Sequence, residues 1–75
     1  LEVEAVASAF ESARTALING EETMDFGLIQ LALQPDLGLK EEGYLLDLSG
    51  EKVSIQASSK AGLWYGLMTL GQILE

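Results

Sequence analysis

The sequence predicts an α/β (α+β) two-layer sandwich, in which two helices pack on one face of a small sheet that contains a β-hairpin. Three observations predict it. Apolar residues recur every three or four positions near both ends of the chain, and they alternate with polar residues in the middle. The chain has 75 residues, which is enough for one domain and no more. We therefore read residues 1–75 as a single small domain.

The first helix is predicted from Val3 to about Ile18. Val6, Phe10 and Leu17 are among the apolar residues that gather on one side of a helix, and polar residues fill the other side. Asn19 and Gly20 tolerate the left-handed backbone conformation that commonly ends a helix. The helix should therefore stop just before them.

A strand is predicted over residues 28–34. Ile29, Leu31 and Leu33 alternate there with Gln30 and Ala32, which is the period of a half-buried strand. Pro35 ends the pattern because proline cannot donate to a sheet ladder. The preceding stretch, residues 21–27, is expected to be a polar connector, and residues 37–43 a loop.

A hairpin is predicted over residues 44–58, with Gly50 and Glu51 as a two-residue turn. This register places the mainly apolar pairs on one face of the sheet, and a slip of one residue would destroy the match. The expected pairs are Leu48 with Val53, Asp47 with Ser54, Leu46 with Ile55, Leu45 with Gln56 and Tyr44 with Ala57.

The second helix is predicted over residues 60–75, capped by the hydroxyl groups of Ser58 and Ser59. Each glycine costs a helix roughly 1 kcal/mol relative to alanine, so two of them in one helix indicate that a neighbour needs the space. We expect Gly62 and Gly66 to allow a neighbouring backbone, most simply that of the first helix, to approach closely. A stripe that should lie on the sheet is formed by Leu63, Leu67, Leu70 and Leu74. The residues expected to point away from it and to contact another domain are Trp64, Tyr65, Met68 and Gln72.

Composition excludes several classes of function. Twelve acidic and four basic residues give a net charge of -8, which disfavours nucleic acid and anionic membrane surfaces as ligands. No apolar run approaches the ~20 residues that span a bilayer. The chain has no cysteine and no histidine, so disulfides and the commonest metal ligands are absent. We expect no cofactor and no metal.

The carboxylate pairs at residues 21–22 and 41–42 raise the hypothesis of a glycosidase, because cleavage of a glycosidic bond uses two carboxylates. Both pairs fall in predicted loops, where a solvated carboxylate is the ordinary case, so we assign no catalytic residue. Glu21, Glu22 and Asp25 lack the spacing of a dedicated calcium loop. Trp64 and Tyr65 could stack on a sugar ring, but neighbours on a helix diverge by about 100°, which favours packing.

The run from residue 42 onward resembles a known family. Its pattern is Glu-x-Tyr-x-Leu, a hairpin, Ile-x-Ala, and then Gly-x-x-Tyr-Gly-x-x-Thr-Leu-x-Gln-(Leu or Ile)-Leu. This is similar to the small α/β domain that precedes the catalytic barrel in family 20 glycoside hydrolases, the β-N-acetylhexosaminidases. The sequence departs at Met68, where the family commonly has glutamine. The matching residues are Glu42, Tyr44, Leu46, Ile55, Ala57, Gly62, Tyr65, Gly66, Thr69, Leu70, Gln72, Ile73 and Leu74.

The resemblance implies a fragment of a secreted or periplasmic glycosidase, whose partner is the catalytic barrel of the same chain. It also implies that a first strand could be missing. The chemistry in that family belongs to an Asp-Glu pair on the barrel, and no position here corresponds to it. Three alternatives stay open: the equivalent domain of another glycosidase such as an α-glucuronidase, a free-standing acidic module that self-associates through helix 60–75, and an enzyme in its own right.

Overall fold

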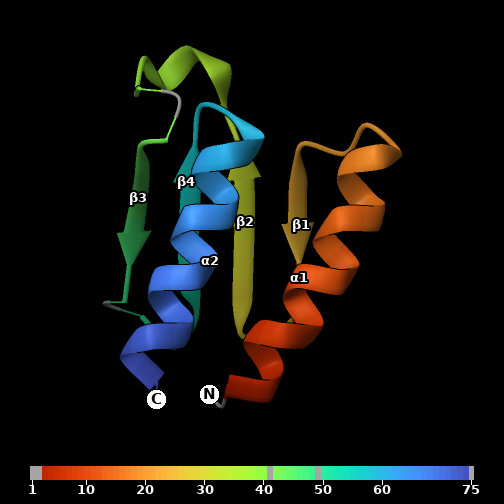
Figure 1. Ribbon diagram of the computed structural model, residues 1–75, viewed down its shortest axis with the longest axis vertical. Coiled ribbons are helices and arrows are strands. Elements are labelled where there is room, and N and C mark those ends of the chain that lie inside the picture. The colour runs from red at the N-terminus through yellow and green to blue at the C-terminus, as the bar shows by residue number, and fades with distance from the viewer. Residues whose placement is uncertain (1–2, 41, 49, 75) are drawn as a thin grey trace.

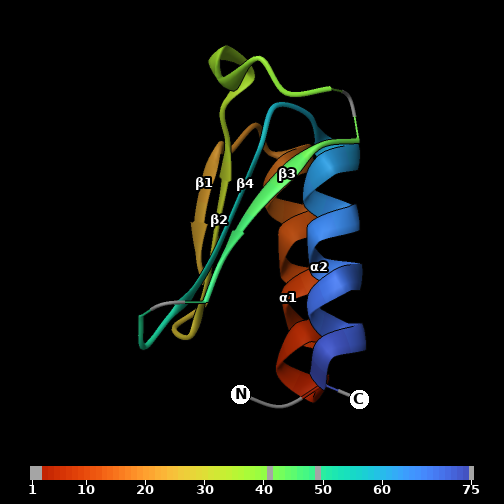
Figure 2. The same cartoon turned by 90° about the vertical axis from the view of Figure 1, so that its left-hand side faces the viewer.

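The architecture is a four-stranded sheet with two helices on one face. The computed structural model describes residues 3–40, 42–48 and 50–74 (Figure 1). Figure 2 shows both helices on the same side of the sheet, so the predicted two-layer sandwich is confirmed. In chain order the elements are α1 (Val3–Ile18), β1 (Thr23–Asp25), β2 (Ile29–Leu33), the 3-10 turn η1 (Pro35–Leu37), β3 (Tyr44–Asp47), β4 (Val53–Ala57) and α2 (Lys60–Leu74).

The sheet is mixed, with the strand order β1-β2-β4-β3. β1 is antiparallel to β2, β2 is parallel to β4, and β3 is antiparallel to β4. The predicted strand over residues 28–34 is therefore the central strand β2, which pairs from Ile29 opposite Val53 to Leu33 opposite Ala57. Its side chains at Ile29 and Leu31 are buried, as the alternation predicted.

The prediction of a polar connector over residues 21–27 is wrong, because Thr23–Asp25 forms β1. The Met24 side chain is buried in the core, while Thr23 and Asp25 on either side are exposed. Gly27, with a φ of 83°, allows the tight turn into β2, and the Phe26 N–H donates to the Ile29 carbonyl at 2.8 Å. One buried methionine between polar neighbours is too short a pattern to indicate a strand without its partner.

The hairpin register is confirmed at four pairs, from Tyr44 opposite Ala57 to Asp47 opposite Ser54. The fifth predicted pair, Leu48 with Val53, lies beyond the end of β3. On its other side, Val53 pairs with Ile29 of β2, and its N–H donates to the Leu28 carbonyl at 2.8 Å. Ser49, beside the predicted turn, lies outside the described residues.

α1 ends where the sequence predicts. The Gly20 backbone is left-handed, with a φ of 83°, and the Glu21 N–H closes the last turn by donating to the Ala16 carbonyl at 3.0 Å. The buried side of the helix is built mostly from small residues, which lets α1 lie close to α2. The core that results contains Val6, Ala9, Ala13, Ala16, Leu17, Met24, Ile29, Leu31, Val53, Ile55, Ala57, Leu63, Leu67 and Leu70.

α2 begins at a serine cap. The Gly62 N–H donates to the Ser59 hydroxyl oxygen at 3.3 Å, as predicted, whereas the Ser58 hydroxyl accepts a hydrogen bond from the Leu39 N–H at 3.0 Å and fixes the loop before β3. The predicted leucine stripe faces the sheet. Leu63, Leu67 and Leu70 are fully buried, and Leu74 is partly buried against the same core.

The neighbour of Gly62 and Gly66 is the sheet, so the prediction that they contact the first helix is wrong. A Cβ atom on Gly62 would lie 2.3 Å from the Gly43 carbonyl oxygen and 2.8 Å from the Ala57 Cβ. A Cβ atom on Gly66 would lie 2.6 Å from the Ile55 Cγ2. Both glycines therefore occur on the side of α2 that faces β3 and β4.

One turn after Gly66, the Thr69 hydroxyl forms a hydrogen bond with the hydroxyl of Tyr44 in β3. The Tyr44 ring also lies beside the position that a Cβ on Gly66 would take, at 3.4 Å. The glycine pair and this hydrogen bond together hold α2 on β3 and β4.

We predict that Gly62→Ala lowers the free energy of unfolding of the 75-residue chain, as measured by urea denaturation. Overpacking against a backbone carbonyl costs about 1–3 kcal/mol. This outweighs the roughly 1 kcal/mol that alanine gains in a helix. Gly71→Ala is the matched control, because the nearest atom to its added Cβ is the Val6 Cγ1 at 3.8 Å. It should preserve or raise stability, and equal effects of the two substitutions would contradict this packing.

Candidate domain interface

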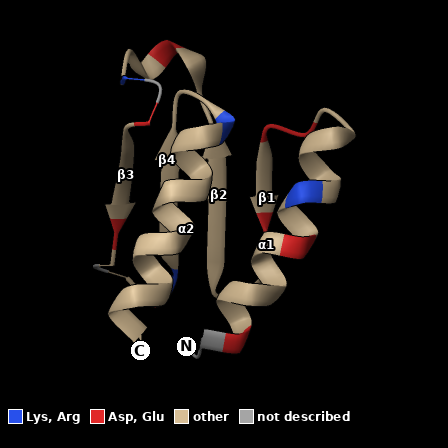
Figure 3. Cartoon of the chain, viewed as in Figure 1, with Lys and Arg blue, Asp and Glu red and all other residues tan. Residues whose placement is uncertain are grey.

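The outer side of α2 carries exposed side chains without charge. Tyr65 is 43% exposed and Met68 is 50% exposed, and Gln72 follows one turn later on the same side of the helix. Lys60 is the only charged residue among positions 60–74, and in Figure 3 the rest of the described helix has the tan colour of residues that are neither acidic nor basic. Three of the four residues predicted to contact another domain therefore share one uncharged surface.

Trp64, the fourth predicted residue, takes a different position. Its ring stacks on the Phe10 ring of α1, with centroids 5.5 Å apart and planes 13° from parallel. The side chain is half-buried and joins the two helices to each other. One face of the indole is thus used inside the domain, which supports packing over a sugar-binding role for this residue.

A groove runs between the two helices beside this stack, with a volume of about 290 Å³. α2 contributes Met68 and Gln72 to it, so the predicted contact residues form one of its sides. α1 contributes residues that the sequence analysis assigned only to the core or did not single out. The complete lining is Val6, Ala7, Phe10, Leu67, Met68, Gly71 and Gln72.

We define these residues, together with Tyr65 and Trp64, as the helical surface. The sequence analysis did not predict the α1 residues of this surface. Helix periodicity shows which residues share one side of a helix, but it does not show which other element lies beside that side. The available signal was the apolar side of the first helix, which includes Val6 and Phe10.

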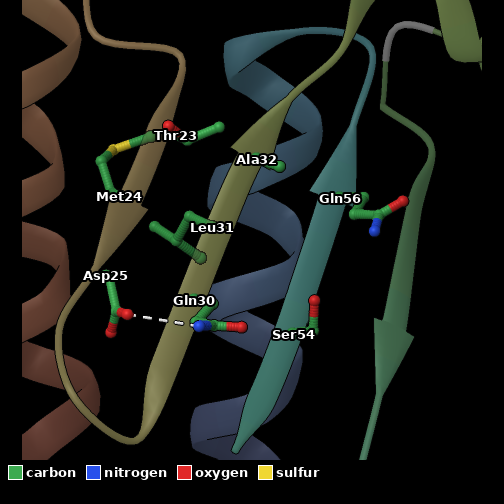
Figure 4. A pocket seen from close by; sticks show the side chains of 8 residues that line it. All are labelled: Thr23, Met24, Asp25, Gln30, Leu31, Ala32, Ser54 and Gln56. Atoms are coloured by element: carbon green, nitrogen blue, oxygen red, sulfur yellow. Dashed lines mark hydrogen bonds between the residues drawn. The ribbon is translucent and has the colours of Figure 1, made fainter.

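The opposite face of the sheet has no helix over it and carries a second hollow, of about 320 Å³ (Figure 4). Its polar side chains come from β1, β2 and β4: Thr23, Asp25, Gln30, Ser54 and Gln56. It contains no aromatic side chain that could stack on a sugar.

Asp25 is the ionisable group of this hollow, and its partners hold it in the charged form. Its carboxylate accepts hydrogen bonds from the Gly27 N–H at 2.9 Å and from the Gln30 side-chain amide at 3.2 Å, and Lys52 Nζ lies 3.4 Å away. These contacts, the Gly27 N–H first, lower the pKa of Asp25 below its ordinary value of 3.8. A general acid in glycoside hydrolysis needs a raised pKa, so Asp25 is unsuited to that role.

The loop carboxylates form no site either. Glu21, Glu22 and Glu42 are exposed, and Glu41 lies outside the described residues. Among the residues that the structure describes, no three acidic, histidine or cysteine side chains come together in a way that could bind a metal ion. No helix in the described part of the chain is long and apolar enough to cross a membrane.

Comparison with known protein families matches residues 2–75 to domain 2 of glycosyl hydrolase family 20. The chain belongs to glycosyl hydrolase family 20. The resemblance read from the sequence is thereby confirmed, and the match also covers residues 2–41, which precede the motif. Searches among curated proteins and among solved structures found no significant match.

The structure explains what the family 20 motif residues do in this domain. Gly62 and Gly66 let α2 approach β3 and β4, and Thr69 bonds to Tyr44 across the same contact. Glu42, Tyr65, Gln72 and Ile73 are exposed, and of these Tyr65 and Gln72 lie on the helical surface.

The Asp25 hydrogen bonds generate a prediction about acid stability. Because the pKa of Asp25 is lower in the folded chain, its contribution to stability is complete above pH 3.8 and is lost as the pH falls through the folded-state pKa. The carboxyl NMR resonance of Asp25 should titrate with a midpoint below 3.8, and Gln30→Met should raise that midpoint by removing one donor. A midpoint at or above 3.8 would contradict the geometry.

Proposed function

We propose that this domain is a non-catalytic part of a β-N-acetylhexosaminidase and that its helical surface docks on the catalytic barrel. The observation that carries the proposal is the exposed, uncharged outer side of α2, on a chain whose net charge is -8. Acidic residues are plentiful on this molecule, yet none occurs among positions 60–74. A helix that faced water throughout the life of the protein would be expected to carry charges there.

Family membership supports a supporting role for this domain and a catalytic role for another domain of the same enzyme. Domain 2 of a family 20 glycoside hydrolase belongs to an enzyme that also has a catalytic domain. The resemblance places the acid and the substrate-orienting carboxylate on that catalytic barrel. Nothing in the described residues of this chain offers a buried acid or an aromatic platform of its own. Its contribution is to bind to the barrel and support it.

The expected interaction is apolar at its centre. Moving a fully exposed methionine side chain into a fully buried position contributes roughly 1.5–3 kcal/mol. Met68 is half-exposed, so burying the rest of its side chain is worth about half of this. Tyr65 adds apolar ring area and a hydroxyl group that can bond at the rim, which is the role tyrosine often has at interfaces.

The other functions considered from the sequence have less support. Two copies of the chain would bring like charges together, which acts against self-association through helix 60–75. The family match favours a family 20 enzyme over the equivalent domain of an α-glucuronidase.

We predict that Met68→Asp destabilises the complete protein that the gene encodes and leaves the 75-residue chain almost unchanged. An aspartate in a buried apolar contact costs several kcal/mol, whereas the same residue in water costs little. Thermal unfolding of both proteins measures the difference. Leu45→Asp is the matched control, since Leu45 is 49% exposed but lies on the helix-free face of the sheet.

Two results would contradict the proposal. One is equal destabilisation of the chain and of the complete protein by Met68→Asp. The other is a gene product that has no catalytic domain for the helical surface to contact.

A further inference from the structure

Gly71 is the one glycine of α2 that the contacts of this domain do not explain. Gly62 and Gly66 leave no room for a Cβ atom, but a Cβ atom on Gly71 would meet only the Val6 Cγ1, at an ordinary contact distance of 3.8 Å. Its φ is not in the left-handed region that favours glycine. Alanine would stabilise this helix position by roughly 1 kcal/mol, so the isolated domain gains nothing from the missing side chain.

The position of Gly71 links this observation to the helical surface. Gly71 lines the groove between α1 and α2, with Val6 and Phe10 opposite and Met68 and Gln72 next to it on α2. A side chain at position 71 would occupy part of this groove. The glycine therefore keeps open a space that the domain does not fill.

The groove suits a protein side chain better than a small metabolite. Its volume of about 290 Å³ is at the lower limit of ligand pockets, which usually span about 300–1,000 Å³ and contain several convergent polar groups. Here Gln72 supplies the only polar side chain of the lining, and no lining residue is charged. A large apolar side chain, such as that of leucine, methionine or phenylalanine, matches these walls.

We propose that one apolar side chain of the catalytic domain inserts into the groove over Gly71 and contacts the bare backbone of α2. This inference rests on the proposed function, because it names the way in which the helical surface binds the barrel. A second copy of the chain is disfavoured as the occupant by the net charge of -8. Gln72 lies at the same groove, where its amide can pair with a polar group beside the inserted side chain.

The test places a side chain at position 71, so that the domain itself fills the groove. In the 75-residue chain, Gly71→Ala and Gly71→Leu should preserve or raise the free energy of unfolding, because the space beside Val6 is open. In the complete protein, Gly71→Leu should speed hydrogen exchange of the α2 amides by about tenfold, because it displaces the inserted side chain and weakens docking by 1.4 kcal/mol. Gly71→Ala, which is too small to fill the groove, should have a weaker effect in the same direction.

The outcomes separate this inference from the proposal on which it rests. If Met68→Asp speeds exchange and Gly71→Leu does not, the barrel docks on the helical surface without inserting a side chain, and the inference is overturned. If neither substitution changes exchange in the complete protein, the docking proposal itself fails. If Gly71→Leu unfolds the isolated chain, the groove is not open and the inference fails for that reason.

Discussion

The close approach of α2 to β3 and β4 is the constraint on which the rest of the structure depends. It exists because Gly62 and Gly66 have no side chains at the two points where α2 meets the Gly43 carbonyl and Ile55. With the helix at this depth, Leu63, Leu67 and Leu70 are buried completely and Thr69 reaches the Tyr44 hydroxyl. The same contact fixes the rotation of the helix about its axis, and that rotation leaves Tyr65 and Met68 facing outward. The surface proposed for docking is thus a consequence of how the core is packed.

The features that the sequence could predict were those with a local signal. The capped start of α2, the end of α1 and the register from Tyr44 opposite Ala57 each depend on a turn, a cap or an alternation that is visible in a few adjacent residues. The features that it could not predict come from partners far along the chain. β1 forms because Met24 pairs with Leu31 of β2 and its side chain is buried in the core. The stacking of Trp64 on Phe10 joins residues in different helices. The spacing of Gly62 and Gly66 indicated that another part of the chain approaches α2 closely, but it did not show that this part is the sheet.

The two faces of the domain differ in a way that bears on function. The helix-free face of the sheet is polar, and its best-placed carboxylate, Asp25, is held ionised by a backbone N–H, an amide and a lysine that tie β1 to the start of β4. This arrangement stabilises the turns at one end of the sheet and offers no proton for catalysis. No residue that lines the groove of the helical surface is charged, and open space remains beside Gly71. Under the proposed function, the helix-free face of the sheet stays in contact with water, and the helical surface on the opposite side binds the neighbouring domain.

The central claim is that the helical surface is covered in the complete protein, and the two methionines of the chain allow it to be measured directly. Met24 is buried in the core and Met68 is half-exposed on α2, so Met24 serves as an internal standard for Met68. Brief peroxide treatment followed by mass spectrometry gives the rate at which each thioether is oxidised. The account predicts that Met68 reacts much faster than Met24 in the 75-residue chain and that both react slowly in the complete protein. Equally fast oxidation of Met68 in the two proteins would contradict it.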